Sequence, residues 1–186
     1  MAQAHAQVSF DDEPLVLVDE HDTVLGYESK QRCHDGAGLL HRAFSVFLFD
    51  ASGALLLQQR SATKRLWPLF WSNSCCSHPR RGEETQSAAE RRVREELGLV
   101  ASLRAVYAFT YRARYAELGS EYELCHVLYG RQSGSPRVND NEIAACRLVT
   151  PAALDRELVD SPELFTPWLK LEWQRLRRDY WPSLVF

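Results

Sequence analysis

The chain has 186 residues, of which 45% are hydrophobic and 25% are charged, and its formal net charge is −3. This length predicts one domain with a substantial hydrophobic core. The slightly acidic balance argues against a nucleic-acid binder, whose surface usually carries excess positive charge. The apolar runs are far shorter than the ~20 residues that a membrane-spanning helix needs, so we expect no membrane partner.

The cysteines are irregularly spaced, and two of them are adjacent. They lie at positions 33, 75, 76, 125 and 146. An odd number at such spacings does not match a disulfide framework, and no secretory signal is recognisable. We therefore expect a cytoplasmic protein with reduced thiols.

The first half of the chain predicts a short tail followed by strands. Residues 1–12 are polar and lack periodicity, which predicts a flexible N-terminal tail ahead of a single domain over residues 13–186. Apolar runs bounded by turn residues predict strands at 15–18, 24–27, 43–50 and 55–60. A glycine-containing loop over 34–41 leads into the third of these strands.

The clearest helix is predicted over residues 82–98. Its apolar positions recur at helical spacing, at Ala88, Ala89, Val93 and Leu97. Glu83 and Glu84 are expected in its first turn, and Gly98 can end it. Further strands are predicted at 102–112, 121–130 and 144–149, and further helices at 151–158 and 167–179. Because strands and helices mix without regular βαβ repetition, the fold class is α+β or a mixed-sheet α/β sandwich.

Three histidines and two carboxylates are candidate ligands of a divalent metal. His34 and His41 flank the glycine-containing loop, and His78 lies in the segment before the predicted helix. Glu121 and Glu123 share one face of a predicted strand, because side chains alternate along a strand. This nitrogen and oxygen set suits Zn²⁺, Mn²⁺ or Fe²⁺ better than Mg²⁺. The other histidines are expected to be ordinary surface or core side chains: His5, His21 and His126.

Arg60, Lys64 and Arg92 form a candidate cationic set. Arg92 lies four residues before Glu96, so both side chains share one helix face. One interpretation is a surface ion pair that stabilises the helix by ~0.3–0.5 kcal/mol. The other is diphosphate recognition, with Glu96 holding Mg²⁺ against the phosphates. The residues alone leave both interpretations open.

A series of motifs, taken in order along residues 14–175, resembles one family. The matching segments are His34-x₆-His41-x-Ala43-Phe44, Arg60-x₃-Lys64-x₂-Trp67-Pro68, Trp71-x-Asn73-Ser74, Cys76-Ser77-His78, Glu96-Leu97-Gly98, Tyr111-Arg112, Glu121-x-Glu123, Val138-Asn139-Asp140-x-Glu142 and Phe165-x-Pro167-Trp168. Together they resemble the type 1 isopentenyl-diphosphate Δ-isomerases, which belong to the Nudix superfamily. The resemblance implies a Nudix-like α/β/α sandwich with a mixed β-sheet.

The general Nudix pattern can be laid on residues 77–99, with two informative departures. Ser77 replaces a glycine, and Arg92 replaces a glutamate that hydrolytic members use to bind metal. Losing that carboxylate and gaining a cation favours a protein that holds a diphosphate without cleaving it. A Nudix pyrophosphohydrolase remains the alternative, and a non-catalytic diphosphate- or metal-binding regulator is a third hypothesis.

The resemblance implies an enzyme of isoprenoid biosynthesis that interconverts isopentenyl diphosphate and dimethylallyl diphosphate. The reaction is a 1,3-allylic proton shift through a tertiary carbocation. Cys76 and Glu123 match the family's proton-carrying pair, and Tyr111 is expected to hydrogen-bond near Glu123. The indole of Trp168 would stabilise the carbocation, because an aromatic face attracts a cation by ~0.5–2 kcal/mol.

The resemblance also implies two metal sites and a diphosphate site. One Zn²⁺ or Mn²⁺ would be held by His34, His41, His78, Glu121 and Glu123. Mg²⁺ would bind with the substrate diphosphate, held by Glu96 and the backbone carbonyl of Cys76. The substrate-binding cations would be Lys30, Arg60, Lys64 and Arg92. Cys75 is expected to be structural, and the protein is expected to be a monomer because no exposed apolar seam is visible.

Overall fold

The computed structural model describes residues 6–184 of the chain. Within these residues the strands are β1 (Pro14–Val18), β2 (Val24–Ser29), β3 (His41–Phe49), β4 (Leu55–Arg60), β5 (Trp71–Ser72), β6 (Cys75–Ser77), β7 (Leu103–Tyr115), β8 (Gly119–Arg131) and β9 (Ile143–Val149). The α-helices are α1 (Lys30–His34), α2 (Thr85–Leu97), α3 (Pro151–Asp160) and α4 (Pro167–Arg175). A π-helical segment over Leu176–Tyr180 extends α4, and short 3₁₀ turns cover Pro162–Leu164 and Trp181–Ser183.

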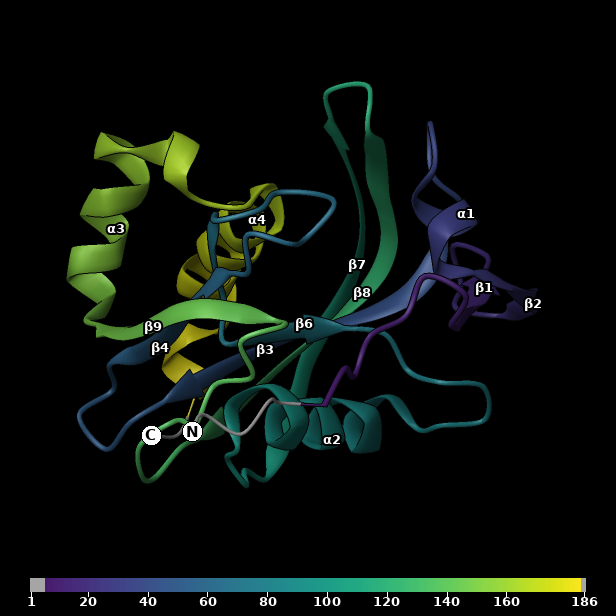
Figure 1. The fold of residues 1–186 in the computed structure, drawn as a ribbon. Helices are drawn as coiled ribbons and strands as arrows, with labels where there is room; N and C mark the ends of the chain where they lie inside the picture. The colour runs from purple at the N-terminus through teal and green to yellow at the C-terminus, as the bar shows by residue number, and fades with distance from the viewer. Residues whose placement is uncertain (1–5, 185–186) are drawn as a thin grey trace.

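All of these strands form one mixed sheet with β3 near its centre (Figure 1). Strand β3 pairs in parallel with β8 and antiparallel with β1, β4 and β6. Strands β7 and β8 form a long antiparallel hairpin, and β4 pairs with β9 along one edge and with β3 and β5 along the other. The parallel β3–β8 pair is what makes the sheet mixed.

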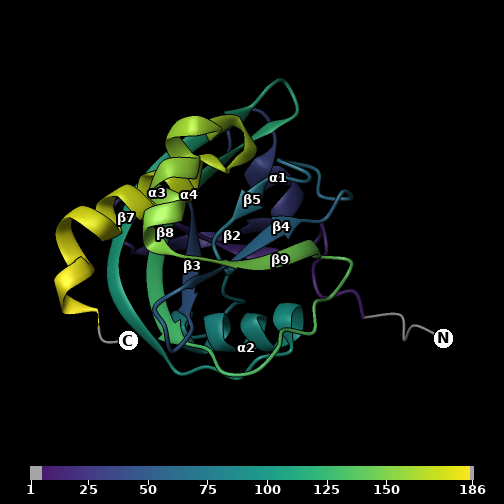
Figure 2. The same cartoon turned by 90° about the vertical axis from the view of Figure 1, so that its left-hand side faces the viewer.

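Helices cover both faces of the sheet, which gives the predicted α/β/α sandwich. Figure 2 shows α2 on one side of β3 and β9, and α3 and α4 on the other. The α2 side is packed with small and branched residues, among them Ala88, Val93 and Leu97. The α4 side is more aromatic and includes Phe47 and Trp173. Since β3 is buried on both faces, its sequence is almost continuously apolar.

Helix α2 begins later than the spacing of its apolar residues predicted. Gly82 has a φ of 74°, a left-handed conformation that suits a turn rather than a helix. Glu83 closes this turn, since its Oε2 accepts a hydrogen bond from the backbone N–H of Arg80 at 2.9 Å. Glu84 is the N-cap residue. The placement of Glu83 and Glu84 in the first helical turn was therefore wrong, whereas the end of the helix at Gly98 is confirmed.

Two short segments for which the sequence predicted no helix or strand contain regular structure. His34 ends the short helix α1, whose N-cap Ser29 accepts a hydrogen bond at Oγ from the N–H of Arg32. The segment before α2 carries the short strands β5 and β6, which pair with β4 and β3. Elements of two to five residues are too short to show a period, and only their pairing partners reveal them. No helix of the described residues is long and apolar enough to cross a membrane.

Candidate functional site

Strand register brings the predicted catalytic residues together. On one side of β3, Ser45 lies opposite Cys76 of β6. On its other side, His41 lies opposite Glu123 of β8, and Tyr111 of β7 lies opposite the same glutamate. Pairing across four strands therefore places the thiol, the carboxylate and the phenol around one point.

Three imidazoles converge at this point with their Nε2 atoms. His34 Nδ1 lies 2.7 Å from the carbonyl oxygen of Lys30, and His41 Nδ1 lies 2.7 Å from that of Leu39. A carbonyl can only accept, so each Nδ1 carries a proton, and in the neutral imidazole each Nε2 presents a lone pair. This arrangement is the usual outer support of a metal-binding histidine.

The ring nitrogens and a carboxylate oxygen lie so close together that a cation between them would stabilise the cluster. His41 Nε2 lies 3.1 Å from His78 Nε2, and His78 Nε2 lies 3.1 Å from Glu123 Oε1. One ligand atom from each of His34, His41, His78 and Glu123 falls within 4.8 Å of the others, and all four residues are buried. A buried convergence of basic nitrogens around a carboxylate fits a divalent metal, and the donor set is that of Zn²⁺ or a similar ion.

Glu121, the fifth predicted ligand, lies at the side of this cluster. Its Oε2 is 2.8 Å from His34 Nε2. Burial favours the neutral carboxyl, but His34 outweighs burial and holds the pKa of Glu121 below its ordinary value. The pKa of Glu123 is also lowered, because contacts to His41 and Tyr111 overcome its burial. Both carboxylates are therefore ionised near neutral pH, as metal ligands must be.

The pKa values of His34 and His78 are shifted by the same close packing of ionisable groups. Burial and the neighbouring His41 and His34 hold the pKa of His78 well below its ordinary value. A neutral imidazole is the form that binds a metal. For His34, burial also opposes the charge, but Glu121 outweighs it and raises the pKa.

The thiol of Cys76 is held as a neutral donor. Its Sγ donates to Asn73 Oδ1 at 2.8 Å and lies 3.5 Å from Ser45 Oγ. Burial raises the pKa of Cys76 to about 12, so the sulfur carries its proton at neutral pH. The adjacent Cys75 points to the α2 side and is fully buried in that core, as expected of a structural cysteine.

Glu123 also contacts Tyr111, as predicted. The Tyr111 hydroxyl donates to Glu123 Oε2 at 2.7 Å, while Glu123 Oε1 faces the histidines. Burial and Glu123 raise the pKa of Tyr111 well above its ordinary value, so the phenol keeps its proton. One carboxylate thus connects the metal cluster to the cavity.

A cavity of about 860 Å³ opens beside these groups. Its lining includes all four predicted catalytic residues: Cys76, Glu123, Tyr111 and Trp168. It also includes all four predicted substrate-binding cations: Lys30, Arg60, Lys64 and Arg92. A volume of this size accommodates a small organic ligand with a charged head.

Trp168 forms an aromatic wall of this cavity. Its Nε1 donates to Ser72 Oγ at 2.9 Å, which fixes the indole plane. The Arg60 guanidinium carbon lies 5.2 Å from the centre of the Trp168 ring, and Trp67 meets the same ring edge-on at 5.3 Å. Arg60 in turn donates to the backbone carbonyls of Leu66 and Trp67 at 2.9 and 3.0 Å. The Trp168 ring and the Arg60 guanidinium therefore restrain each other's position.

Arg92 and Glu96 form a buried pair, which excludes the interpretation as a surface ion pair. Arg92 donates twice to Glu96 Oε1, from Nη2 at 2.6 Å and from Nε at 3.0 Å. Each side chain is only 4% exposed. Glu96 does not line the cavity, and the predicted Mg²⁺ role of Glu96 and of the Cys76 carbonyl stays a prediction.

Glu142 is a member of the cationic end to which sequence reasoning gave no role. It pairs with Lys64 and lies 3.4 Å from Arg92 Nη2. Burial favours its neutral form, but Lys64 and Arg92 outweigh burial and lower the pKa of Glu142. Burial and the positive charge of Lys64 lower the pKa of Lys30. The cationic end is thus a crowded set of charges in which Glu142 is a counterion to both Lys64 and Arg92.

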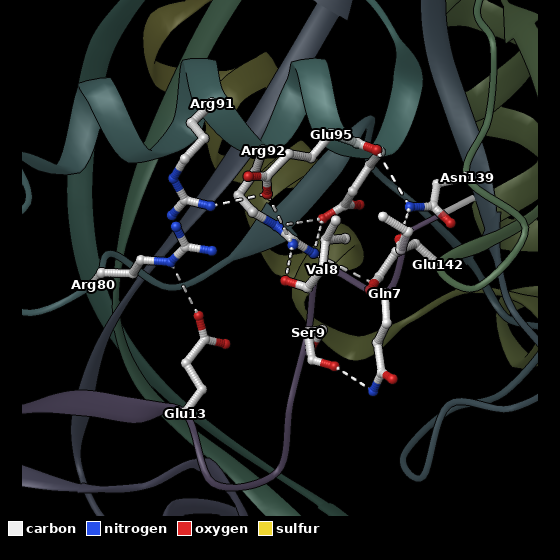
Figure 3. A network of polar contacts seen from close by, with 12 residues as sticks. Gln7, Val8, Ser9, Glu13, Arg80, Arg91, Arg92, Glu95, Asn139 and Glu142 are labelled. Atoms are coloured by element: carbon white, nitrogen blue, oxygen red, sulfur yellow. Dashed lines mark hydrogen bonds and ion pairs between the residues drawn. The ribbon is translucent and has the colours of Figure 1, made fainter. Parts of the chain in front are cut away.

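The chain segment ahead of β1 crosses this cationic end (Figure 3). Arg92 Nη1 donates to the carbonyl of Val8 at 2.6 Å, and Asn139 Nδ2 donates to that of Ala6 at 2.9 Å. Lys30 contacts the hydroxyl of Ser9. That residues 1–12 form a flexible tail stays a prediction, and residues 1–5 of it lie outside the described residues.

Comparison with known proteins identifies the family. A model of the NUDIX domain matches residues 39–169. The isopentenyl-diphosphate Δ-isomerase of Nocardia farcinica is 45% identical over 157 residues, covering 84% of this chain and 90% of that protein. One from Photorhabdus laumondii is 42% identical, covering 89% and 99%. The chain belongs to the Nudix-type isopentenyl-diphosphate Δ-isomerase family.

Solved structures show the same fold. A crystal structure of a Deinococcus radiodurans protein superposes with a TM-score of 0.74 at 25% identity, covering 89% of this chain and all of that one. A MutT protein from Methanosarcina mazei, 15% identical, superposes with a TM-score of 0.61 and shares the fold. The Nudix fold predicted from the sequence is confirmed.

Proposed function

We infer that the chain is an isopentenyl-diphosphate Δ-isomerase, which interconverts isopentenyl diphosphate and dimethylallyl diphosphate. One observation carries the inference: a single cavity is lined by a neutral thiol, by a carboxylate bonded to a phenol and by four cations. Its proton-handling groups suit an allylic shift, and its cations suit a diphosphate. The relatives named as isomerases support the same conclusion.

Cys76 and Glu123 exchange protons with the substrate in this proposal. An alkene is a weak base, so one group must deliver a proton to it while the other removes a proton from the neighbouring carbon. Positioned acid and base groups contribute ~10²–10⁴-fold each. Tyr111 supports Glu123 through its hydrogen bond of 2.7 Å.

The aromatic wall stabilises the tertiary cation that forms between these two proton transfers. The face of the Trp168 indole attracts positive charge, and the attraction grows where water is excluded. Trp168 is 3% exposed and Tyr111 is 7% exposed, so this part of the cavity is well shielded. Shielding also prevents water from capturing the cation as an alcohol.

The cationic end holds the diphosphate while the allylic group reacts. Lys30, Lys64 and Arg92 lie around one region, and Arg60 lies over the indole. An allylic diphosphate is a good leaving group, so retaining it requires charge neutralisation and several contacts. Arg92 adds positive charge to this end, while its own donors bind Glu96 and the Val8 carbonyl.

Two metal ions complete the proposal. The buried cluster of His34, His41, His78 and Glu123, with Glu121 beside it, would hold one Zn²⁺ or Mn²⁺. Mg²⁺ would bind with the diphosphate, near Glu96 and the Cys76 carbonyl. When bound, the ions supply positive charge that orients Glu123 and neutralises the diphosphate.

A Nudix pyrophosphohydrolase is the rival function, and the carboxylates of α2 argue against it. Hydrolytic Nudix chemistry needs several free glutamates on this helix. Here Glu83, in the turn before the helix, and Glu95 both bind Arg91, and Arg92 occupies a position that is a glutamate in hydrolytic members. A non-catalytic regulator would leave the intact Cys76 and Glu123 arrangement without a purpose.

The roles of Cys76 and Glu123 are tested by Cys76→Ala and Glu123→Gln. Each should lower kcat for isopentenyl diphosphate by about 10²–10⁴-fold, because each removes one proton-transfer group. Cys146→Ala is the matched control, since this cysteine lies on β9 outside the cavity lining. Product would be measured by separating the two diphosphates. Activity within about tenfold of the unmodified protein in either active-site variant would contradict the roles.

The proposal places this reaction in the cytoplasm, in a monomer with reduced thiols. All five cysteines are free, and Cys33, Cys75 and Cys125 are buried. A reducing compartment keeps Cys76 available as a thiol.

A further inference from the structure

Two buried polar side chains lie behind the cavity, between the indole of Trp168 and the thiol of Cys76. Ser72 ends strand β5 and Asn73 follows it, and both are 0% exposed. Trp168 and Cys76 belong to the cavity lining, whereas Ser72 and Asn73 do not. Any influence of these two side chains on a bound ligand must therefore pass through the cavity residues that they contact.

The hydroxyl of Ser72 uses its full hydrogen-bonding capacity. Trp168 Nε1 donates to Ser72 Oγ at 2.9 Å, and Thr166 Oγ1 donates to it at 3.2 Å. An indole N–H can only donate, so Ser72 must accept from Trp168. The proton of Ser72 goes to Asn73 Oδ1 at 3.0 Å, which is nearer than Cys76 Sγ at 3.8 Å.

The side-chain amide of Asn73 is oriented by two backbone carbonyls. Its Nδ2 donates to the carbonyl oxygens of Val46 and Cys75, each at 3.2 Å. Carbonyls only accept, so the amide nitrogen faces them and Oδ1 faces the other way. Cys76 Sγ donates to this oxygen at 2.8 Å, beside the hydroxyl of Ser72. Both donors and both acceptor positions of the amide are thus occupied.

These contacts form one continuous path of hydrogen bonds from the indole to the thiol. Its two ends come from distant segments, because Trp168 lies in the first turn of α4 and Cys76 lies on β6. The backbone joins the same segments, since the Thr166 N–H donates to the carbonyl of Trp71 at 2.9 Å. A buried polar network whose members are all paired is rigid, because breaking one contact leaves an unpaired group away from water.

We propose that Ser72 is a positioning residue that fixes the indole of Trp168 directly and the thiol of Cys76 through Asn73. This rests on the proposed isomerase function, in which the thiol exchanges a proton with the substrate and the indole faces the cation. The cation exists only between the two proton transfers, so both groups must be in place at the same moment. Misplacing a reacting group by about 1 Å can lower a rate by about hundredfold.

Ser72→Ala removes the hydroxyl that joins the two ends of this path. It should lower kcat for isopentenyl diphosphate by about tenfold to hundredfold, while KM changes by less than about twofold. The small effect on KM is expected because the ion pairs and hydrogen bonds of Lys30, Lys64 and Arg92 do not involve this network. A general loss of folded protein would lower the amount of active enzyme without this dependence on one hydroxyl.

Ser74→Ala is the matched control, because it makes the same change at an equally buried serine of the same segment. Ser74 is 0% exposed, and its Oγ donates to the Leu56 carbonyl at 2.6 Å and accepts from the Leu48 N–H at 2.8 Å. Its hydroxyl therefore has structural partners but none on the path to Cys76. Ser74→Ala should keep kcat within about threefold of the unmodified protein.

The indole N–H of Trp168 gives a readout that does not depend on catalysis. Its peak in proton–nitrogen NMR spectra is identified by its loss in Trp168→Phe. Exchange of this proton with D₂O should be about tenfold or more faster in Ser72→Ala, because the N–H loses its acceptor, and unchanged in Ser74→Ala.

A double variant tests the connection to Cys76 separately. Trp168→Phe keeps an aromatic face but has no N–H to bind Ser72. Adding Ser72→Ala to it should lower kcat by a further threefold or more (about 0.6 kcal/mol), because the path through Asn73 is still lost. No further loss would show that Ser72 acts on the indole alone, which would overturn the proposal.

Three other results would also overturn it: kcat of Ser72→Ala within about threefold of the unmodified protein, equal losses in Ser72→Ala and Ser74→Ala, or unchanged exchange of the Trp168 N–H in Ser72→Ala. An unmodified protein that converts no isopentenyl diphosphate would contradict the isomerase function instead, and the exchange measurement would still decide whether Ser72 holds the indole.

Discussion

At the scale of single residues, the metal cluster depends on two backbone carbonyls. The oxygens of Lys30 and Leu39 fix the tautomers of His34 and His41, so both Nε2 atoms present lone pairs to the centre. The short helix α1 and the start of β3 are thus parts of the proposed metal site. Without a cation between them, the facing nitrogens would repel each other.

His41→Gln should therefore abolish tight metal binding. Loss of an outer hydrogen-bond partner costs metal affinity ~10–100-fold, and losing a ligand itself should cost more. Metal content after dialysis, measured by elemental analysis, should fall from about one Zn²⁺ or Mn²⁺ per chain to well below one. The control is His126→Ala, since His126 pairs with Asp22 at 2.9 Å away from the cluster. Equal metal content in the two variants would contradict the site.

The raised pKa of Glu172 predicts how the free energy of unfolding depends on pH. Its pKa is raised to about 8 in the folded protein, whereas an unfolded glutamate has its ordinary value of 4.5. Between these values unfolding releases a proton, so the free energy of unfolding falls as pH rises, by about 1.4 kcal/mol per unit. Below pH 4.5 both states hold the proton and the effect vanishes.

Glu172→Gln removes this dependence. The variant should gain stability relative to the unmodified protein as pH rises from 5 to 8, by a few kcal/mol in total, and show no such gain below pH 4.5. Urea unfolding at several pH values measures the difference. A difference that stays constant with pH would show that Glu172 is ionised in the folded protein.

Sequence patterns identified the residues that we propose to react, but not all of the groups packed around them. Cys76, Glu123 and the histidines could be predicted because their types and order match a family motif. Glu172 could not, because a glutamate in the helix sequence Leu-Glu-Trp-Gln-Arg normally faces solvent. Only the packing of α4 against the sheet shows that Glu172 is buried against Cys125.

At the scale of elements, α1 and the β7–β8 hairpin meet at Gly119. A Cβ atom at Gly119 would lie 2.3 Å from the backbone oxygen of His34, closer than real contacts allow. The φ of this residue is also 154°, a region that favours glycine. A side chain here would push His34, a proposed metal ligand, away from the start of β8.

Gly119→Ala should thus lower both stability and metal affinity. Gly53→Ala is the matched control, since its φ is 80° but nothing lies within 4 Å of the added Cβ. Both variants strain the backbone, and only Gly119→Ala adds a clash, which typically costs 1–3 kcal/mol more. Urea unfolding and metal titration provide the two readouts. Equal losses in both variants would contradict the role of this contact.

The long elements were predictable, and the short ones were not. Strands β3 and β4 and helix α2 carry enough residues to show an apolar run or a helical period. The strands β5 and β6 have two and three residues, and their pairing with β4 and β3 is set by residues distant in sequence. Since β6 positions Cys76, the missed strand is the one that aligns the thiol with Ser45.

At the scale of the whole molecule, one continuous sheet separates and connects the core on its α2 side and the core on its α4 side. A chain that begins at Glu13 should therefore fold as one unit and unfold in a single transition, with circular dichroism and tryptophan fluorescence giving the same midpoint. Light scattering of the full chain should give the mass of a monomer, about 21.3 kDa. Two separate transitions would contradict the single domain, and a doubled mass would contradict the monomer.

Solvent proton exchange tests the central claim most directly. In D₂O with Mg²⁺ and isopentenyl diphosphate, the protein should produce dimethylallyl diphosphate and place deuterium on the carbons that exchange protons, while releasing no phosphate. Mass spectrometry and phosphate analysis follow both outcomes in one sample. Release of phosphate or diphosphate without deuterium in the recovered substrate and product would contradict the isomerase account.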